Sequence, residues 1–258
     1  GSAKVNYYDY GDDVRQNSMD KVNEAAAIAK KSDLAIVVVG ENPLRYQKSK
    51  TCGENIDRMG LDLLGTQNQL VQKIHETGVP TIVVLVGGRP LSVNWIAQNV
   101  QALVQAWEPG SLGGRALANI LAGKVNPSAK LPISIPRHSG QIQMIYNHKP
   151  SQYFHKYIDG PSTPLYPFGF GLSYTRFAYS SLKLSHTRIS DKDSFTASIE
   201  LTNVGDREGT EVVQLYIRDI YSSATRPVKE LKDFARVTLK PGEKKTVTFT
   251  VTPDKLAY

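Results

Sequence analysis

Two hydrophobic periods alternate along the first half of the chain. Apolar residues recur every three or four positions over residues 18–29, which predicts a helix that Ser18 can cap. Residues 34–39 are then apolar throughout, which is typical of a strand covered by helices on both faces. The same two patterns return as a helix over residues 67–75 and a strand over residues 81–86.

Three further segments continue this alternation. They predict a short helix over residues 91–96, a strand over residues 102–107 and a helix over residues 113–121. Strands and helices that alternate with short links form a mostly parallel sheet flanked by helices. We therefore predict an α/β sandwich domain over residues 1–135.

The hydrophobic period changes to two in the last third of the chain. Apolar and polar residues alternate over residues 195–202, 213–217 and 247–251, and turn residues separate these runs. This pattern predicts an all-β sandwich of the immunoglobulin or fibronectin type over residues 177–258. Only four or five strands fit before the chain ends, so we expect the sandwich to be incomplete.

Residues 136–176, which connect the two domains, are rich in Pro, Gly and aromatic residues. The prolines exclude regular structure over most of this segment. A disordered linker would be poor in aromatic residues. We therefore expect an ordered strap that lies across both domains.

Charge and composition exclude several classes of function. The chain has 31 Lys and Arg against 24 Asp and Glu, a net charge of +7 that is spread along the sequence. Nucleic-acid binding is disfavoured, because it requires a dense basic stripe. Cys52 is the single cysteine and the five histidines are scattered, so we expect no metal site and no cofactor. No apolar run approaches the length of a membrane-spanning helix.

The long loop over residues 40–65 is the place where chemistry is expected. It follows the first predicted strand, and open parallel sheets bind their ligands outside the carboxyl ends of the strands. Glu41, Glu54, Asp57 and Arg58 all lie in this loop. Taken alone, each acidic residue of the loop is better explained as a solvated surface charge.

The residues around Glu54 resemble a loop of the family 3 glycoside hydrolases, the β-glucosidase and β-xylosidase family. The segment Gly53-Glu54-Asn55-Ile56-Asp57-Arg58 is similar to the family's Gly-Glu-x-x-Asp-Arg. Three later segments match family motifs in the same order, although Ala129 replaces a usual glycine. They are Trp107-Glu108-Pro109-Gly110, Asn126-Pro127-Ser128-Ala129-Lys130-Leu131-Pro132 and Pro167-Phe168-Gly169-Phe170-Gly171-Leu172-Ser173-Tyr174-Thr175.

The resemblance implies a role for Glu54 in a two-carboxylate reaction. In this family the Glu of the loop is the general acid/base, and the nucleophilic Asp lies on an N-terminal (β/α)8 barrel that nothing here resembles. A retaining glycosidase holds its two carboxyl groups about 5 to 5.5 Å apart. The resemblance also implies that the last predicted domain is fibronectin-III-like.

The resemblance further implies that the chain is the C-terminal part of a retaining, exo-acting β-glycosidase, with β-glucosidase as the first expectation. Its substrate would be a β-linked oligosaccharide or glycoside, cleaved at the terminal non-reducing β-D-glycosyl residue. Xylose and glucosamine stay open as alternative sugars. We expect the barrel of the same parent protein as a partner, a periplasmic or secreted location, and truncation at both ends of this chain.

Several alternatives remain beside this interpretation. Glu41 also follows a glycine but lacks the Asp-Arg pair. Asp57 and Arg58 are expected to support the loop, with direct contact to sugar as the alternative, because an arginine too close to Glu54 would oppose proton donation. Residues 87–90, Gly-Gly-Arg-Pro, lack the signature of a nucleotide site, so we interpret them as a tight turn with Pro90 in the first turn of a helix. The chain could also be a non-catalytic carbohydrate-binding or partner-binding scaffold.

Overall fold

The computed structural model describes residues 4–5, 17–42, 50–150 and 157–257. The chain divides into two compact units that do not follow one another simply along the sequence. One unit comprises residues 1–117, 135–144 and 162–166, and the other comprises residues 118–134, 145–161 and 167–258. The domain limits expected from the sequence stay a prediction.

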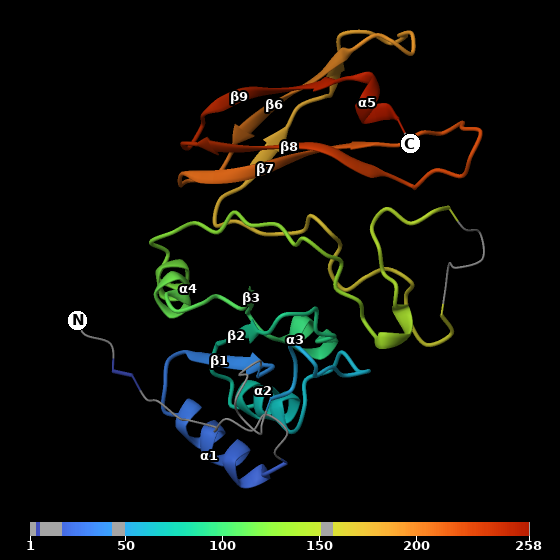
Figure 1. The fold of residues 1–258 in the computed structure, drawn as a ribbon. Helices are drawn as coiled ribbons and strands as arrows, with labels where there is room; N and C mark the ends of the chain where they lie inside the picture. The colour runs from blue at the N-terminus through green and yellow to red at the C-terminus, as the bar shows by residue number, and fades with distance from the viewer. Residues whose placement is uncertain (1–3, 6–16, 43–49, 151–156, 258) are drawn as a thin grey trace. The chain divides into compact units, whose positions relative to one another are not determined.

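The first unit is built on a parallel three-stranded sheet (Figure 1). Its strands run in the order β1-β2-β3, and β2 pairs in parallel with both neighbours. A parallel sheet with crossover helices confirms the predicted α/β class. The elements of this unit are β1 (Ala35–Gly40), β2 (Thr81–Val86), β3 (Ala102–Trp107), α1 (Met19–Ala29), α2 (Gln67–His75) and α3 (Asn94–Asn99).

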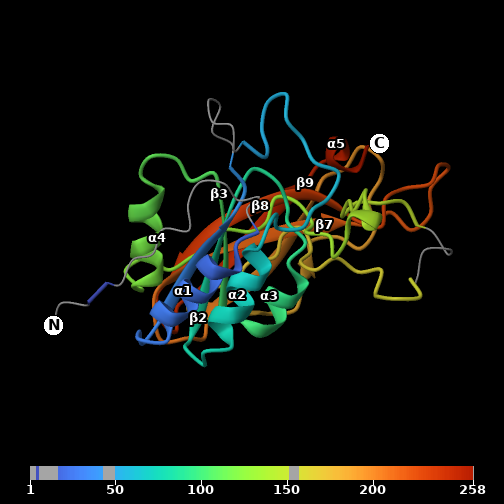
Figure 2. The same ribbon diagram turned by 90° about the horizontal axis from the view of Figure 1, so that it is seen from below.

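The core of this unit lies between the sheet and its helices. Both views place α1 and α2 on the same side of the sheet (Figure 1, Figure 2). Val22 of α1, Val71 of α2, Val83 of β2 and Ile96 of α3 are all completely buried in one cluster. Burying a side chain of this size contributes about 1.5 to 3 kcal/mol, so this cluster fixes the strand ends that carry the candidate site.

The expectation that both faces of the first strand are covered is wrong for β1. Along this strand buried and exposed residues alternate, and Ile36 and Val38 are 51% and 61% exposed. Their neighbours Val37 and Val39 belong to the core. The physical reason is that β1 is an edge strand of the described sheet, and α1 and α2 pack on only one of its faces.

The helix expected over residues 91–96 begins three residues later, at Asn94. Ser92 has non-helical partners, because its backbone N–H donates to Leu61 O at 2.9 Å and its hydroxyl donates to Pro136 O at 3.0 Å. Leu91 is 1% exposed, so the segment before α3 is nevertheless part of the core. The expectation that Pro90 lies in the first turn of a helix is therefore wrong.

The strap is ordered where it is described, although residues 151–156 lie outside the described part. It holds one short 3-10 helix, η1 (Ser139–Gln141). Within the first unit, Ile135 and Tyr166 form an antiparallel bridge, and the Ile135 N–H donates to Tyr166 O at 2.8 Å. Isolated backbone pairs of this kind replace regular strands in a Pro-rich segment.

The second unit contains an antiparallel β-sandwich. In one sheet β6 pairs with β4, β5 and β9, and in the other β7 pairs with β8. The described residues of this unit form six strands instead of the four or five expected, because two of the strands are too short for a visible alternation. The elements are β4 (Phe177–Tyr179), β5 (Lys183–Leu184), β6 (Phe195–Asn203), β7 (Gly209–Ile217), β8 (Glu230–Leu239), β9 (Lys244–Val251) and α5 (Pro253–Leu256).

The core of the sandwich follows the predicted alternation. Leu201 of β6, Val213 of β7, Leu239 of β8 and Phe249 of β9 point into one buried cluster. The helix α4 (Gly113–Leu121) precedes the sandwich in the chain and matches its expected bounds. None of the described helices has the length and apolar character needed to cross a membrane.

Candidate active site

Glycines at the carboxyl ends of β1 and β2 allow the two strands to approach closely. Gly40 has φ 145°, and a Cβ there would lie 1.8 Å from Val86 O. Gly87 has φ 149°, and a Cβ there would lie 3.3 Å from the Cβ of Glu41. Only glycine adopts these conformations without strain. The backbone of Glu41 therefore stays paired with β2, through a 2.9 Å hydrogen bond from its N–H to Val86 O.

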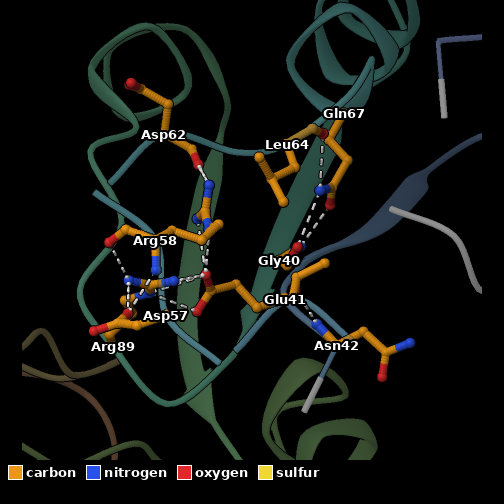
Figure 3. A network of polar contacts seen from close by, with 10 residues as sticks. Gly40, Glu41, Asn42, Asp57, Arg58, Asp62, Leu64, Gln67 and Arg89 are labelled. Carbon is orange, nitrogen blue, oxygen red and sulfur yellow. Dashed lines mark hydrogen bonds and ion pairs between the residues drawn. The ribbon is translucent and has the colours of Figure 1, made fainter. Parts of the chain in front are cut away.

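A buried carboxylate lies directly after β1. The side chain of Glu41 is only 1% exposed and accepts hydrogen bonds from two arginines (Figure 3). Arg58 donates from Nε and Nη2 to Glu41 Oε1, at 3.0 and 2.8 Å. Arg89 donates from Nε to Oε1 and Oε2 of Glu41, at 2.9 and 3.1 Å. These charge-assisted bonds make Glu41 a structural centre.

Arg89 connects this centre to the loop that carries Glu54. Its Nη1 donates to Asp57 Oδ1 at 2.7 Å and to Arg58 O at 3.1 Å. Its Nη2 lies 2.9 Å from Glu41 Oε1 but lacks hydrogen-bond geometry there. Burial alone would lower the pKa of Arg89, but the hydrogen bond and charge of Glu41 and the charge of Asp57 raise it above its ordinary value. We call Glu41, Asp57, Arg58 and Arg89 the Glu41 network.

The turn that holds Glu54 is anchored on its N-terminal side as well. Thr51 N donates to Asn42 O at 2.8 Å, and Asn42 N donates to Thr51 Oγ1 at 3.0 Å. Cys52, the next residue, is 6% exposed. These contacts fix the chain immediately before the turn to the extension of β1.

The turn itself is closed by a backbone hydrogen bond from Ile56 N to Gly53 O at 3.0 Å. Asn55 adopts φ 62°, a left-handed conformation that asparagine tolerates better than most residues. The side chain of Glu54 is exposed, and Lys50 Nζ donates to the backbone O of Glu54 at 2.7 Å. Glu54 thus lies on a short, closed turn at the surface of the unit.

A pocket of about 520 Å³ adjoins this turn at the carboxyl ends of the strands. Acidic and basic side chains line the wall of this pocket, together with the residues that directly precede and follow Glu54 in the turn. Burial, together with the charges of Glu41 and Glu108, raises the pKa of the Cys52 thiol in this wall. The lining residues are Glu41, Cys52, Gly53, Asn55, Ile56, Asp57, Gly88, Arg89 and Glu108.

A buried glutamine closes the other side of the site (Figure 3). Gln67, the first residue of α2, is 2% exposed. Its amide nitrogen donates to Gly40 O at 3.0 Å, and its side-chain oxygen accepts from Gly40 N at 2.7 Å. The side chain therefore satisfies both backbone groups at the end of an edge strand, where a strand neighbour would otherwise be needed.

The structure brings the predicted site residues to one edge of the sheet. Asp57 and Arg58 both belong to the Glu41 network, and Glu54 lies three residues before Asp57 on the same loop. Sequence reasoning missed Arg89. A usable signal was present, because Arg89 lies three residues after the carboxyl end of β2, and ends of adjacent parallel strands lie side by side.

Both tryptophans of the chain lie in the first unit. Trp95 packs against the core of the unit and meets His75 edge to face, with ring centroids 5.4 Å apart. Trp107 ends β3 with φ 55°, which is rare for a bulky residue. Among the described residues, no group of three His, Cys, Asp or Glu side chains is arranged to hold a metal ion.

Comparison with known protein families divides the chain into two matched segments. Residues 1–174 match the glycosyl hydrolase family 3 C-terminal domain, and residues 211–258 match the fibronectin type III-like domain. These two matches correspond to the predicted α/β fold followed by the β-sandwich.

Individual relatives carry names of glycosidases. A β-xylosidase of Formosa agariphila is 46% identical over 98% of this chain, and a periplasmic β-glucosidase of Salmonella typhimurium is 40% identical over 92% of it. The chain spans 35% and 32% of these two proteins, about a third of their length.

Solved structures give the same result. A β-glucosidase from Erythrobacter marinus superposes with a TM-score of 0.86 at 41% identity, over 93% of this chain and 32% of the other. A β-glucosidase from Listeria innocua in complex with glucose gives 0.84 at 34% identity, over 94% and 34% of the two chains. The chain therefore belongs to glycosyl hydrolase family 3, of which it contains the C-terminal domain followed by a fibronectin type III-like domain.

Proposed function

We propose that the parent protein of this chain is a retaining, exo-acting β-glycosidase in which Glu54 is the general acid/base. The observation that carries this proposal is the position of Glu54. It is exposed on a closed turn beside a pocket, at the carboxyl ends of the parallel strands. A proton donor must be reachable by a substrate and held in a defined position, and this turn provides both conditions.

In the proposed reaction Glu54 acts twice. Its carboxyl group first protonates the departing glycosidic oxygen while the nucleophilic carboxylate attacks the anomeric carbon. Its carboxylate then removes a proton from water, and the resulting attack releases the sugar from the covalent intermediate. The family resemblance assigns the nucleophile to an Asp on an N-terminal barrel of the parent protein.

Glu41 is the less suitable acid of the two glutamates in this loop region. Its side chain is almost fully buried and bonds to the guanidinium groups of Arg58 and Arg89. A substrate oxygen could reach it only if this network opened. We therefore assign Glu41 to the support of the loop and Glu54 to proton transfer.

Asp57 and Arg58 are proposed as residues that hold the loop in place without reacting. Arg58 directs Nε and Nη2 to Glu41 and Nη1 to Asp62 O at 2.9 Å. The Asp57 carboxylate accepts from Arg58 N at 2.8 Å and from Arg89 Nη1 at 2.7 Å. These contacts favour a supporting role over direct contact with sugar.

We propose β-linked glucosides as the first substrates to test, followed by β-xylosides. Relatives named β-glucosidase and β-xylosidase both match nearly the whole chain. The relative named periplasmic β-glucosidase also supports a periplasmic or secreted location for the parent protein. Fractionation of the native cells with an activity assay on each fraction tests that location.

The role of Glu54 is tested by Glu54→Gln in the full-length parent protein. Glycosides with poor leaving groups need protonation of the departing oxygen, whereas activated aryl glycosides need little. We expect kcat/KM to fall by about 10² to 10⁴ for alkyl glycosides and disaccharides, and far less for dinitrophenyl glycosides. Glu208→Gln, an exposed change in the second unit, is the matched control.

Two results would contradict the proposal. Equal losses for both kinds of glycoside would remove Glu54 from proton transfer. A parent protein without any glycosidase activity that still binds oligosaccharide would favour the alternative of a non-catalytic binding scaffold.

A further inference from the structure

We propose that Arg89 is a positioning residue, which holds the turn carrying Glu54 by bridging Glu41 and Asp57. This inference rests on the proposed function of Glu54. Arg89 belongs to the segment after β2, outside the loop that resembles the family motif. Its contribution would therefore come from a separate part of the chain.

The geometry makes Arg89 the connection between the sheet and the loop. One edge of its guanidinium faces Glu41, with Nε 2.9 Å from Oε1, and Nη1 lies 2.7 Å from Asp57 Oδ1 (Figure 3). Glu41 directly follows β1, whereas Asp57 is 88% exposed and lies on the loop. A planar fork of fixed donors suits this bridge, and a lysine could satisfy only one of the two partners well.

Glu54 lies between two anchors of the loop. The first is the pair of hydrogen bonds between Asn42 and Thr51, which precedes the turn. The second is the bond from Arg89 to Asp57, which follows it. Without the second anchor, the C-terminal side of the turn would be held only by the bonds of Arg58 to Glu41 and Asp62.

The charge balance of the bridge also fits a proton donor nearby. Arg58 and Arg89 carry two positive charges, and Glu41 and Asp57 carry two negative charges within 3 Å of them. The positive charge is thus directed at Glu41 and Asp57. These two described arginines are thus paired with carboxylates of the network, which reduces their effect on the ionisation of Glu54.

The structural part of the inference is tested on this chain by hydrogen exchange of residues 53–58. Asp57→Ala removes the loop end of the bridge, and Arg89→Met removes its centre. We expect Arg89→Met to speed exchange in the turn at least tenfold and Asp57→Ala to speed it severalfold, and Arg115→Met on α4, outside the network, to leave it unchanged. Asp57→Ala keeps the test valid if Arg89→Met folds poorly, because Asp57 is mostly exposed.

The catalytic part is tested in the full-length parent protein. A small displacement of a catalytic group costs about 10²-fold in rate, so we expect Arg89→Met to lower kcat for poor leaving groups by tenfold to about a hundredfold. KM and the rate for activated aryl glycosides should change little. Arg89→Lys should recover part of the loss, and the Asp57→Ala change should add little to Arg89→Met because both break one bridge.

The outcomes separate this inference from the proposed function. A selective loss with Glu54→Gln but none with Arg89→Met or Asp57→Ala would overturn the inference alone. Unchanged exchange of residues 53–58 in both bridge variants would overturn it as well. Equal losses for both kinds of glycoside with Glu54→Gln would refute the proposed function, and with it the role of Arg89 in positioning an acid.

Discussion

Side chains of the Glu41 network differ in exposure, and this difference determines what each can do. Glu41 is 1% exposed and Asp57 is 88% exposed, although both bond to Arg89. Breaking a buried ion pair leaves a charge without compensation, whereas an exposed pair contributes little. The same arginine therefore takes part in one bond that stabilises the fold and another that orders a loop.

We expect Glu41→Gln to lower the free energy of unfolding by about 3 kcal/mol, because it leaves two partly buried guanidinium groups without their shared counter-charge. Asp57→Asn is the matched change and should cost less than about 1 kcal/mol. Urea unfolding followed by tryptophan fluorescence checks this, since both tryptophans, Trp95 and Trp107, lie in the first unit. Equal losses in the two variants would contradict it.

The single cysteine provides a pH-dependent test of the pocket wall. Burial, and then the charge of Glu41, raise the pKa of the Cys52 thiol. We expect iodoacetamide to alkylate folded Cys52 at least about tenfold more slowly at pH 8 than in urea, because less thiolate is present and the thiol is buried. The stability due to the raised pKa is fully present below the unfolded pKa and is lost as the pH rises through the folded pKa. Equal rates in the two states would contradict this account.

At the scale of elements, close contact between β1 and β2 is a condition for the site. A methyl group at Gly40 would lie 1.8 Å from Val86 O, with φ at 145°. We expect Gly40→Ala to lower the free energy of unfolding by at least about 2 kcal/mol. Gly114→Ala in α4, where nothing lies within 4 Å of the new Cβ, should instead stabilise by up to about 1 kcal/mol. Thermal unfolding of both variants checks this pair, and a neutral Gly40→Ala would contradict it.

The sequence pattern predicted most elements of the α/β unit at their observed bounds. The segments that became α2, β2, β3 and α4 have strong periodicity and clear turn residues around them. The start of α3 could not be predicted, because it depends on the bonds of Ser92 to Leu61 and Pro136, which lie far away in the sequence. The two shortest sandwich strands, β4 and β5, were missed because two or three residues show no period.

The candidate site was predictable only in part, for a related reason. Glu54, Asp57 and Arg58 lie together in one loop, so a local motif could identify them. Arg89 joins them across 32 residues, through the parallel pairing of β1 with β2. Such a contact follows from strand order, which a single sequence does not specify. The domain limits near residues 135 and 176 remain our prediction.

At the scale of the whole molecule, the reaction needs more than this chain is proposed to provide. Retaining hydrolysis requires two carboxyl groups about 5 to 5.5 Å apart, and we assign only one of them to this chain. We therefore expect the purified 258-residue chain to hydrolyse neither nitrophenyl β-glucoside nor β-xyloside, whereas the full-length parent protein hydrolyses at least one. Turnover by the chain alone that Glu54→Gln abolishes would contradict the assignment of the nucleophile to another domain.

The central claim is that Glu54 is the acid/base of a double displacement, and azide rescue of Glu54→Ala in the parent protein tests it most directly. With an activated aryl glycoside the variant should still form the glycosyl-enzyme, but water should attack it slowly without its base. Azide needs no base, so we predict that it restores turnover and yields a β-glycosyl azide. No rescue, or an α-glycosyl azide, would contradict the claim.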